Sequence, residues 1–286
     1  MKIIDRKRCV IGEGPIWNEK ENKLYYTNGL DNELRIIDIY TGEKTIRKPD
    51  VGCAAYAFTN DNRLIVSRCD GVFILNDDDT TEKLYDTEKY KIQYANDMKV
   101  GPDGRIYVGT QSQKRIGISD KIDGKLYNID RYGEVKVLID NISLSNGLEW
   151  SMDEKYFYHT DSDTSIIKEY EFDKTNGDIL PTGREISVIG VDGFTINKKD
   201  EIIAACRGQG HIAVADAKTM KIKKYVDVPT KIPASCAFVG NDMEYLAIVT
   251  ASCNGDLELD KNAGFTFLHK VKAGGRKPFL FSKNKE

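Results

Sequence analysis

Four oxygen-bearing side chains recur at equivalent positions of this 286-residue sequence, and together they could bind one divalent cation. The set consists of two carboxylates and two amides: Glu13, Asn96, Asn146 and Asp192. Carboxylates that meet in a buried place repel each other, and a cation between them relieves both the repulsion and the cost of burial. Ligands that are all oxygen favour Ca²⁺, Mg²⁺ or Mn²⁺, although Zn²⁺ also accepts carboxylates. The pattern predicts a single divalent metal site.

An internal repeat defines this equivalence. A short apolar strand, a turn rich in Asn, Asp, Gly or Lys and a second apolar strand occur six times. Successive copies lie roughly 40 to 50 residues apart, the spacing of four-stranded propeller blades. The copies are aligned on their anchor residues Trp17, Phe58, Val100, Trp150, Ile196 and Phe238. Four residues before each anchor stand Glu13, Ala54, Asn96, Asn146, Asp192 and Ala234.

The repeat and its turns predict an all-β fold. Tight turns such as Gly101-Pro102-Asp103-Gly104 join alternating strands, and no long helical period separates them. We therefore predict a six-bladed β-propeller of four-stranded antiparallel blades, formed as one domain by residues 1–286. The innermost strands of such a fold start at the same rim of a central channel, so the four side chains would converge there. Taken singly, each is equally well explained as a turn residue.

Composition narrows the partners. The net charge of -3, with acidic and basic residues interspersed, provides no basic face for nucleic acid or anionic membrane, and no apolar run approaches a membrane span. The six cysteines are scattered singly, without the spacing of a zinc site, which favours reduced thiols in a cytoplasmic protein. We expect a monomer or a weak homo-oligomer that acts on a small molecule.

Several short motifs resemble one known family along nearly the whole chain. They are Gly12-Glu13-Gly14-Pro15-Ile16-Trp17, Asn96-Asp97-Met98-Lys99-Val100-Gly101-Pro102-Asp103-Gly104, Ser145-Asn146-Gly147-Leu148-Glu149-Trp150-Ser151, Asp161-Ser162 and Asp192-Gly193-Phe194. In order and spacing they are similar to the gluconolactonase, regucalcin and luciferin-regenerating-enzyme family. The resemblance implies a six-bladed propeller that hydrolyses sugar lactones. It also implies a metal held by Glu13, Asn146 and Asp192, with Asn96 nearby as a contact either to the substrate or to the ligands and water around the metal.

The resemblance further implies that Asp192 deprotonates the attacking water while the lactone carbonyl is polarised by the metal. Gluconolactone-active animal members have an arginine and a glutamate where this chain has Tyr94 and Lys114, so gluconolactone itself is not assured. Residues after the second strand of each blade should form the pocket wall. Among them, Arg68, Arg207 and Lys114 would make the rim cationic and suited to an acidic substrate, unless they are solvated loop cations.

Other functional patterns are weaker. The three histidines, His159, His211 and His269, lie in different repeats and have no nucleophile elbow, which disfavours a serine hydrolase. Asp161 is interpreted first as a turn residue and second as a pocket residue. The alternative function is a non-catalytic propeller that binds a divalent metal or a small ligand, because a fold that keeps such a site need not keep turnover.

Overall fold

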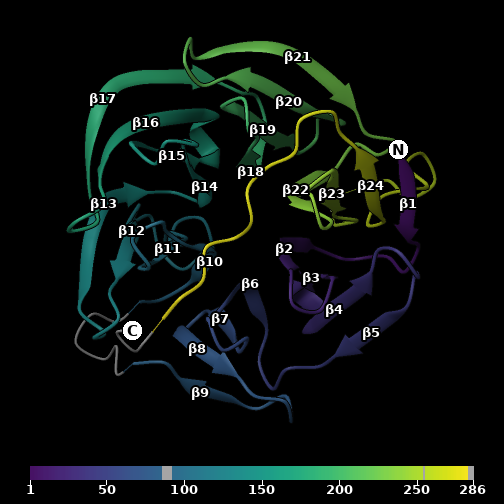
Figure 1. The fold of residues 1–286 in the computed structure, drawn as a ribbon, viewed down its shortest axis with the longest axis horizontal. Helices are drawn as coiled ribbons and strands as arrows, with labels where there is room; N and C mark the ends of the chain where they lie inside the picture. The colour runs from purple at the N-terminus through teal and green to yellow at the C-terminus, as the bar shows by residue number, and fades with distance from the viewer. Residues whose placement is uncertain (86–91, 254, 283–286) are drawn as a thin grey trace.

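The structure, a computed structural model, describes residues 1–85, 92–253 and 255–282. Its strands form six sheets of four antiparallel strands each, and Figure 1 shows these sheets arranged around a central channel. The predicted six-bladed propeller is therefore confirmed. Short apolar strands separated by Gly, Asn and Asp turns bury one sheet face against the next, which accounts for this arrangement.

The first three blades follow the chain in order. Blade 1 comprises β2 (Gly12–Asn18), β3 (Lys23–Asn28), β4 (Glu33–Asp38) and β5 (Lys44–Arg47), with a 3-10 turn, η1 (Gly29–Asp31), between β3 and β4. Blade 2 comprises β6 (Cys53–Phe58), β7 (Leu64–Arg68), β8 (Gly71–Leu75) and β9 (Thr81–Lys83). Blade 3 comprises β10 (Ala95–Val100), β11 (Ile106–Thr110), β12 (Gly124–Ile129) and β13 (Val135–Ile142).

The last three blades complete the ring. Blade 4 comprises β14 (Ser145–Trp150), β15 (Tyr156–Asp161), β16 (Ile166–Asp173) and β17 (Asp178–Ser187), with η2 (Ser162–Thr164) after β15. Blade 5 comprises β18 (Val191–Ile196), β19 (Glu201–Cys206), β20 (His211–Asp216) and β21 (Lys221–Asp227). Blade 6 comprises β22 (Pro233–Val239), β23 (Tyr245–Thr250), β24 (Thr266–Lys270) and the N-terminal strand β1 (Lys2–Asp5).

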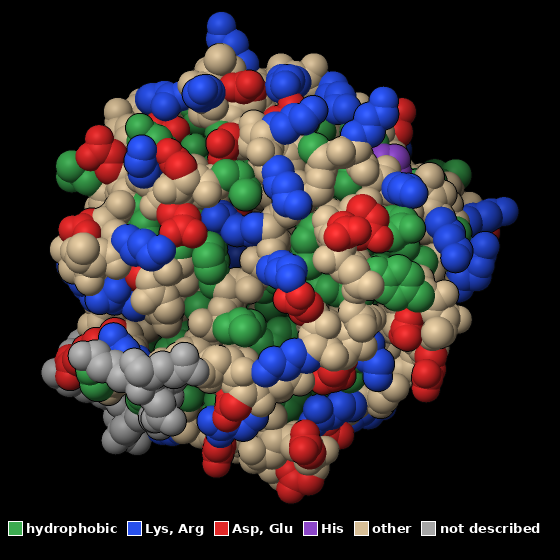
Figure 2. Space-filling view, in the orientation of Figure 1, with side chains coloured by type: hydrophobic (Ala, Val, Ile, Leu, Met, Phe, Trp, Pro, Cys, Tyr) green, Lys and Arg blue, Asp and Glu red, His purple; other side chains and the backbone are tan. Residues whose placement is uncertain are grey.

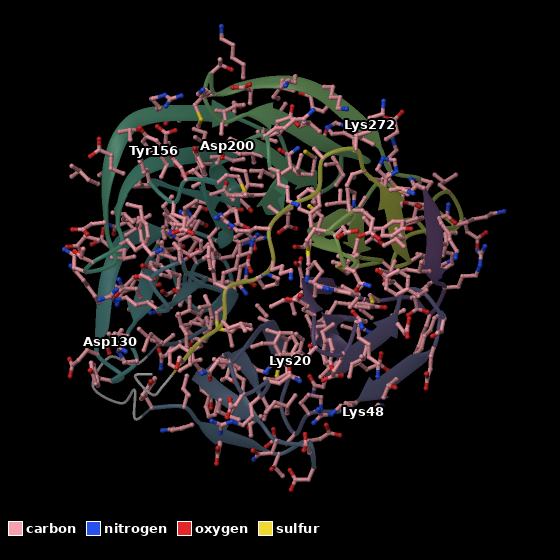
Figure 3. The ribbon with its side chains drawn as sticks, in the orientation of Figure 1. Lys20, Lys48, Asp130, Tyr156, Asp200 and Lys272 are labelled. Carbon is pink, nitrogen blue, oxygen red and sulfur yellow. The ribbon has the colours of Figure 1, made fainter. Side chains whose placement is uncertain are left out.

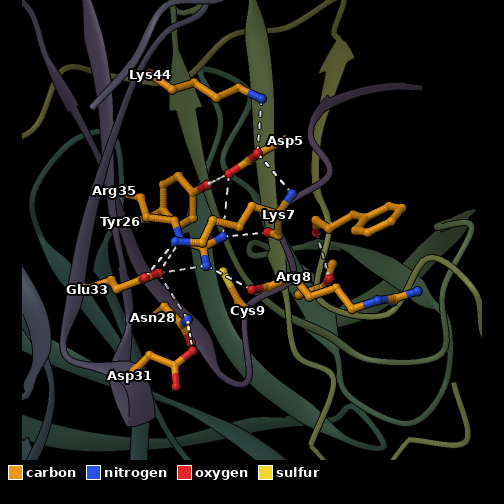
Figure 4. Close-up of polar contacts among 12 residues, drawn as sticks. Asp5, Lys7, Arg8, Cys9, Tyr26, Asn28, Asp31, Glu33, Arg35 and Lys44 are labelled. Carbon is orange, nitrogen blue, oxygen red and sulfur yellow. Dashed lines mark hydrogen bonds and ion pairs between the residues drawn. The ribbon is translucent and has the colours of Figure 1, made fainter. Parts of the chain in front are cut away.

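The ring is closed where β1 pairs with β24, so that the first strand of the chain completes the last blade. A buried ionic network, which we name the closure cluster, ties this junction to blade 1 (Figure 4). Its members are Asp5, Lys7, Glu33, Arg35 and Lys44. Pairing of the two ends of the chain fixes the circumference of the channel that carries the predicted site.

A C-terminal strap, residues 271–282, crosses one end of the channel (yellow in Figure 1). It bridges Asn197 of blade 5 through Gly275 and Thr59 of blade 2 through Phe281. Arg276 of the strap lies 3.1 Å from Glu149 Oε1 in blade 4. The strap ends of the innermost strands lie opposite the ends where the predicted site residues stand, so the strap crosses the channel on the side away from those residues.

Aromatic and aliphatic side chains fill the space between neighbouring sheets. Trp150 is fully buried and contacts the Tyr107 and Phe157 rings at centroid distances of 4.8 and 5.1 Å. Polar bonds also join blades: Asp200, labelled in Figure 3, accepts the Met152 backbone N–H at 2.7 Å. A close-packed propeller of this kind holds side chains from distant parts of the sequence in fixed positions.

The six cysteines are free thiols, four of them buried, as the sequence predicts. Basic, acidic and hydrophobic side chains are interspersed over the face drawn in Figure 2. Among the described residues, no helix has the length and apolar character needed to cross a bilayer.

Candidate metal and lactone site

All six innermost strands carry a β-bulge near the position that the repeat identifies. The register shifts between Glu13 and Ile16, Cys53 and Ala55, Ala95 and Met98, Asn146 and Leu148, Val191 and Phe194, and Pro233 and Ser235. A bulge bends a strand and re-aims the side chains around it. The shared bulge gives the sequence register a structural cause, because it places the same position of every blade at the same level of the channel.

Two carboxylates from opposite parts of the sequence meet at this level. Asp192 is 5% exposed, whereas Glu13 keeps part of its side chain accessible from the channel. Burial raises the pKa of Asp192 to about 7 despite the opposing charge of Arg207. Burial and the negative charge of Asp192 raise the pKa of Glu13 well above its usual value. The two groups thus interact strongly and have no cation of their own that fully compensates them.

Asp97 adds a third negative group close to the pair. Burial raises its pKa, and its charge contributes to the raised pKa values of both Glu13 and Asp192. Sequence reasoning noted Asp97 only as part of a motif. The structure shows that it shares the electrostatic environment of the two candidate ligands.

The two predicted amides are in direct contact. Asn96 Nδ2 donates to Asn146 Oδ1 at 2.6 Å and to the Ser145 carbonyl at 2.9 Å. Asn146 Nδ2 donates to Ser162 Oγ at 2.9 Å, and that hydroxyl donates to the Val191 carbonyl at 2.7 Å. Because the Ser162 proton is already used, the hydroxyl must accept from Asn146, which fixes Oδ1 as the end of the amide that faces Asn96.

Glycines beside the site residues allow this close approach of the blades. A Cβ at Gly147 would come within 2.2 Å of the Phe194 ring, and one at Gly193 within 2.1 Å of Ser235 Oγ. Each glycine directly follows a candidate ligand, Asn146 or Asp192. A side chain there would push neighbouring innermost strands apart and widen the ring of oxygen atoms.

Arg207 is the predicted rim cation that lies closest to the carboxylates. Its Nη1 is 3.7 Å from Asp192 Oδ2, and its Nη2 is 3.0 Å from Cys253 Sγ. Its positive charge lowers the pKa values of both Asp192 and Glu13. It follows β19 in blade 5, where the second-strand rule placed it.

Three other predicted substrate contacts are placed differently. Arg68 turns toward the outer strands, where it donates to Asp70 and lies 4.0 Å from the Phe73 ring centroid. Lys114 is exposed in the β11–β12 loop. Tyr94 is half-buried beside the site, with a positive φ of 58° and its carbonyl accepting from the Gln111 backbone. The structure brings Tyr94 near Asn96 but does not bring Arg68 to the carboxylates.

Sequence reasoning missed Arg115, the neighbour of Lys114. Its Nε is 3.9 Å from Asp163 Oδ1, and its charge lowers the pKa of Asp192. Counting residues from the motif could not distinguish Lys114 from Arg115, because the loop between β11 and β12 has no repeat pattern that fixes its register. Arg115 is therefore the second cation of the rim.

Other polar residues near the site make hydrogen bonds within the protein. Asp161 accepts the backbone N–H groups of Ser143 and Leu144 at 2.8 and 3.0 Å, so it is a turn residue. Gln111 Nε2 lies 3.4 Å from Asn96 Oδ1. Ser145 Oγ and His159 Nε2 are 2.8 Å apart, and burial lowers the pKa of His159 to about 3. That pair is buried and neutral, consistent with packing rather than nucleophilic chemistry.

The donor set fits a hard divalent cation. Two desolvated carboxylates with raised pKa values and an amide oxygen from a third blade form an all-oxygen group. In the part of the chain that the structure describes, no group of three or more His, Cys, Asp or Glu side chains could hold a metal, so any ion here must rely partly on amides. Glu13, Asn146 and Asp192 would hold it.

The fold and this site define a six-bladed propeller whose channel carries a set of candidate oxygen ligands. Residues 11–252 match the sequence model of the SMP-30/Gluconolactonase/LRE-like region, so the chain belongs to that family, as the motifs predicted. It is 30% identical over 284 residues to the "Putative sugar lactone lactonase YvrE" of Bacillus subtilis, covering 96% of each chain. It is 27% identical over 292 residues to the "Pentonolactonase XacC" of Haloferax volcanii, covering 97% of this chain and 96% of the other.

A solved structure supports the fold. The calcium-binding protein regucalcin of Agrobacterium tumefaciens superimposes with a TM-score of 0.87 at 23% identity, covering 98% of this chain and 97% of the other. At this identity the likeness concerns the arrangement of the blades. The residues of this chain must carry the functional argument themselves.

Proposed function

We propose that this protein hydrolyses a sugar lactone or a related small lactone to its hydroxy acid in a metal-dependent reaction. The observation that carries the proposal is the pair of desolvated carboxylates, Glu13 and Asp192, together with the Asn96–Asn146 amide pair at the same level of the channel. The lactonase names of its relatives YvrE and XacC support the same reaction class.

Each residue takes a role that follows from its atoms. Glu13, Asn146 and Asp192 hold one divalent ion, which when bound would supply Lewis-acid polarisation of the lactone carbonyl. Asp192 accepts the proton of the attacking water, because its buried carboxylate would stand beside both the ion and the water. Asn96, fixed by Ser145 and Asn146, is placed to contact the substrate.

The surroundings favour hydrolysis of a small ring over binding of a polymer. The C-terminal strap closes the far end of the channel, so a substrate enters and leaves by the same mouth. Arg207 lies 3.7 Å from Asp192 and restricts what fits beside that carboxylate. With the strap across its far end, the channel suits one small molecule better than a long chain that would thread the ring.

Binding of a divalent ion without turnover is the second candidate. The structural neighbour from Agrobacterium tumefaciens is described as a calcium-binding protein, and the same oxygen set serves both functions. The two candidates differ only in whether a water attacks a bound carbonyl.

A panel of aldonolactones of different ring size decides between them. Acid release is followed at constant pH for chelated protein and after addition of Ca²⁺, Mg²⁺, Mn²⁺ or Zn²⁺, and calorimetry records binding of each ion alone. We expect turnover that chelator removes and one of the ions restores. Asp140→Asn, at an exposed position of β13, is the control variant and should behave as the wild type. Ion binding without hydrolysis of any lactone would favour the second candidate.

A further inference from the structure

We propose that Arg115 and Arg207 form an anion-binding pair that makes this site select lactones which carry a free carboxylate in addition to the lactone ring. This inference rests on the proposed lactone hydrolysis and names the substrate class of the same site. It replaces Arg68 and Lys114 as the cations of the rim.

Arg207 has unused hydrogen-bonding capacity beside the carboxylates. A guanidinium has five N–H donors. Among the described residues, the Arg207 side chain makes one hydrogen bond, to the weak acceptor Cys253 Sγ at 3.0 Å. The nearest Asp192 oxygen is 3.7 Å away, beyond hydrogen-bonding distance, and 30% of the Arg207 side chain is exposed. Donors of Arg207 therefore remain available to a ligand in the channel.

Arg115 has the same character on the other side of blade 4. Within the described ranges its side chain makes only a long ion pair, with Nε 3.9 Å from Asp163 Oδ1. Its position is set by the backbone, where the Arg115 N–H donates to Ser112 Oγ at 3.2 Å. Arg115 comes from blade 3 and Arg207 from blade 5, so the two flank the blade that supplies Asn146. A lactone bound over Asn146 would therefore lie between the two blades that carry these arginines.

Arginines with a structural role look different in this protein. Arg35 donates to the carboxylate of Glu33 and to the carbonyl groups of Lys7 and Arg8. Arg184 donates to both Glu169 oxygens and to two carbonyl groups, and Arg276 donates to Glu149 and to two carbonyl groups. These three guanidinium groups, which join separate parts of the fold, each donate to a carboxylate and to two backbone carbonyl groups. The pair at the channel is left unsaturated.

A bound carboxylate would use the free N–H donors of the two arginines, whereas compensation of the charges of Glu13 and Asp192 would not. Two parallel N–H···O bonds from a guanidinium match the two oxygens of a carboxylate, and such charge-assisted bonds are stronger than neutral ones. If the arginines only offset the charges of Glu13 and Asp192, all lactones would benefit equally. If they bind the substrate, only lactones with an anionic group gain, and the ratio of the two rates reports the difference.

The test compares kcat/KM for three lactones of one ring type: neutral, carboxylate-bearing and phosphate-bearing. We expect wild-type protein to prefer the carboxylate form by about tenfold or more, as a charge-assisted hydrogen bond allows. Arg207→Gln should lower this ratio about tenfold, and the more exposed Arg115→Gln about threefold. Lys121→Gln removes a positive charge from the same loop and should leave the ratio unchanged. Preference for the phosphate form over the carboxylate form would overturn the assignment of substrate class.

Arg207→Lys separates binding from charge. It keeps the positive charge but loses the planar fork, so we expect it to stay defective in the ratio. Full recovery in this variant, or equal losses on neutral and acidic lactones in both glutamine variants, would overturn the proposal. Thermal unfolding of each variant confirms that the ratio is measured on folded protein.

The proposal can be judged even if no lactone is hydrolysed. Calorimetry then compares binding of a dicarboxylate sugar acid with that of the matching monocarboxylate to the intact protein. Tighter binding of the dicarboxylate that Arg207→Gln abolishes would support the anion pair while the proposed hydrolysis fails. Equal affinities for the two acids would refute the anion pair.

Discussion

Two clusters of charged residues in this protein differ in how completely cations of the protein compensate their acids. In the closure cluster, Arg35 Nη2 lies 2.8 Å from Glu33 Oε2, and Lys7 and Lys44 reach Glu33 and Asp5 at 2.7 and 3.0 Å (Figure 4). In the channel, the charge of Asp192 raises the pKa of Glu13, and Arg207 Nη1 lies 3.7 Å from Asp192 Oδ2. The acids of the first cluster are compensated by cations of the protein, whereas the acids of the second are not fully compensated, as we propose for an ion-binding site.

The pKa values of the acids express this difference. Burial alone would raise the pKa of Glu33, but hydrogen bonds from Lys7 and Arg35 outweigh it and lower the pKa to about 2. Burial of Asp192 is not offset, and its pKa rises to about 7. A paired buried acid contributes to stability, whereas an unpaired one costs stability and gains function. The comparison predicts opposite consequences for substitutions in the two clusters.

The largest effect is expected at Asp192. Asp192→Asn keeps the shape but removes the base and one charge of the ion site, so kcat/KM should fall about 10³-fold or more. The free energy of unfolding of chelated protein should not fall, because an uncompensated buried charge is lost. Lactone turnover and urea denaturation of the same preparation measure both quantities. Wild-type turnover by this variant would remove Asp192 from the mechanism.

A second substitution tests the closure cluster. Arg35→Met leaves Asp5 and Glu33 without their buried partner, and loss of one member of such a pair costs about 3 kcal/mol. Urea denaturation should show this loss, while kcat per folded molecule stays near the wild-type value. The matched control is Arg63→Met, whose side chain is 52% exposed and should change stability by only a few tenths of a kcal/mol. A variant as stable as the wild type would mean that the cluster does not hold the ring closed.

The channel cluster could be predicted from sequence because it obeys the repeat. Trp17, Trp150 and their equivalents fix the innermost strands, and the bulges put position four before each anchor at one level. The closure cluster has no such signal, since Asp5 and Arg35 are brought together only when β1 completes the last blade. Long-range pairing of chain ends leaves no periodic trace in the sequence.

Loops limited the prediction of the rim. The rule that second strands end at the mouth placed Arg207 beside Asp192. The same rule placed Arg68 at the mouth, but Asp70 and the Phe73 ring compete for its guanidinium and turn it outward. Arg115 instead of Lys114 approaches Asp163 because hydrogen bonds within the β11–β12 loop set its turn. Side-chain competition of this kind is decided in three dimensions.

The pH dependence of stability should separate the two clusters by sign. The pKa of Glu33 is lowered, so its contribution is present above about pH 4.5 and is lost as the pH falls toward about 2. The pKa of Asp192 is raised, so chelated protein binds its proton more tightly when folded and loses stability as the pH rises from about 4 to about 7. Denaturation in chelator between these limits measures both slopes.

Single variants assign each slope. Glu33→Gln should reduce the pH dependence of stability only between about pH 2 and 4.5, and Asp192→Asn only between about pH 4 and 7. A chelated wild-type protein whose stability rises steadily from pH 4 to pH 7 would contradict the assignment of Asp192 as an uncompensated acid.

The smallest effect is expected at Glu13, where the direction of the change in unfolding free energy is the informative result. Glu13→Gln removes a carboxylate whose pKa is raised by burial and by the charge of Asp192, so chelated protein at neutral pH should gain about 1 kcal/mol of unfolding free energy. The same substitution removes an ion ligand, so added divalent metal should stabilise the variant less than the wild type, because stabilisation by a ligand grows with its affinity. Without metal the variant should therefore melt at a higher temperature than the wild type, and with metal this difference should shrink or reverse. If Glu13→Gln destabilised the chelated protein as Arg35→Met should, Glu13 would belong with the structural acids and the contrast between the clusters would fail.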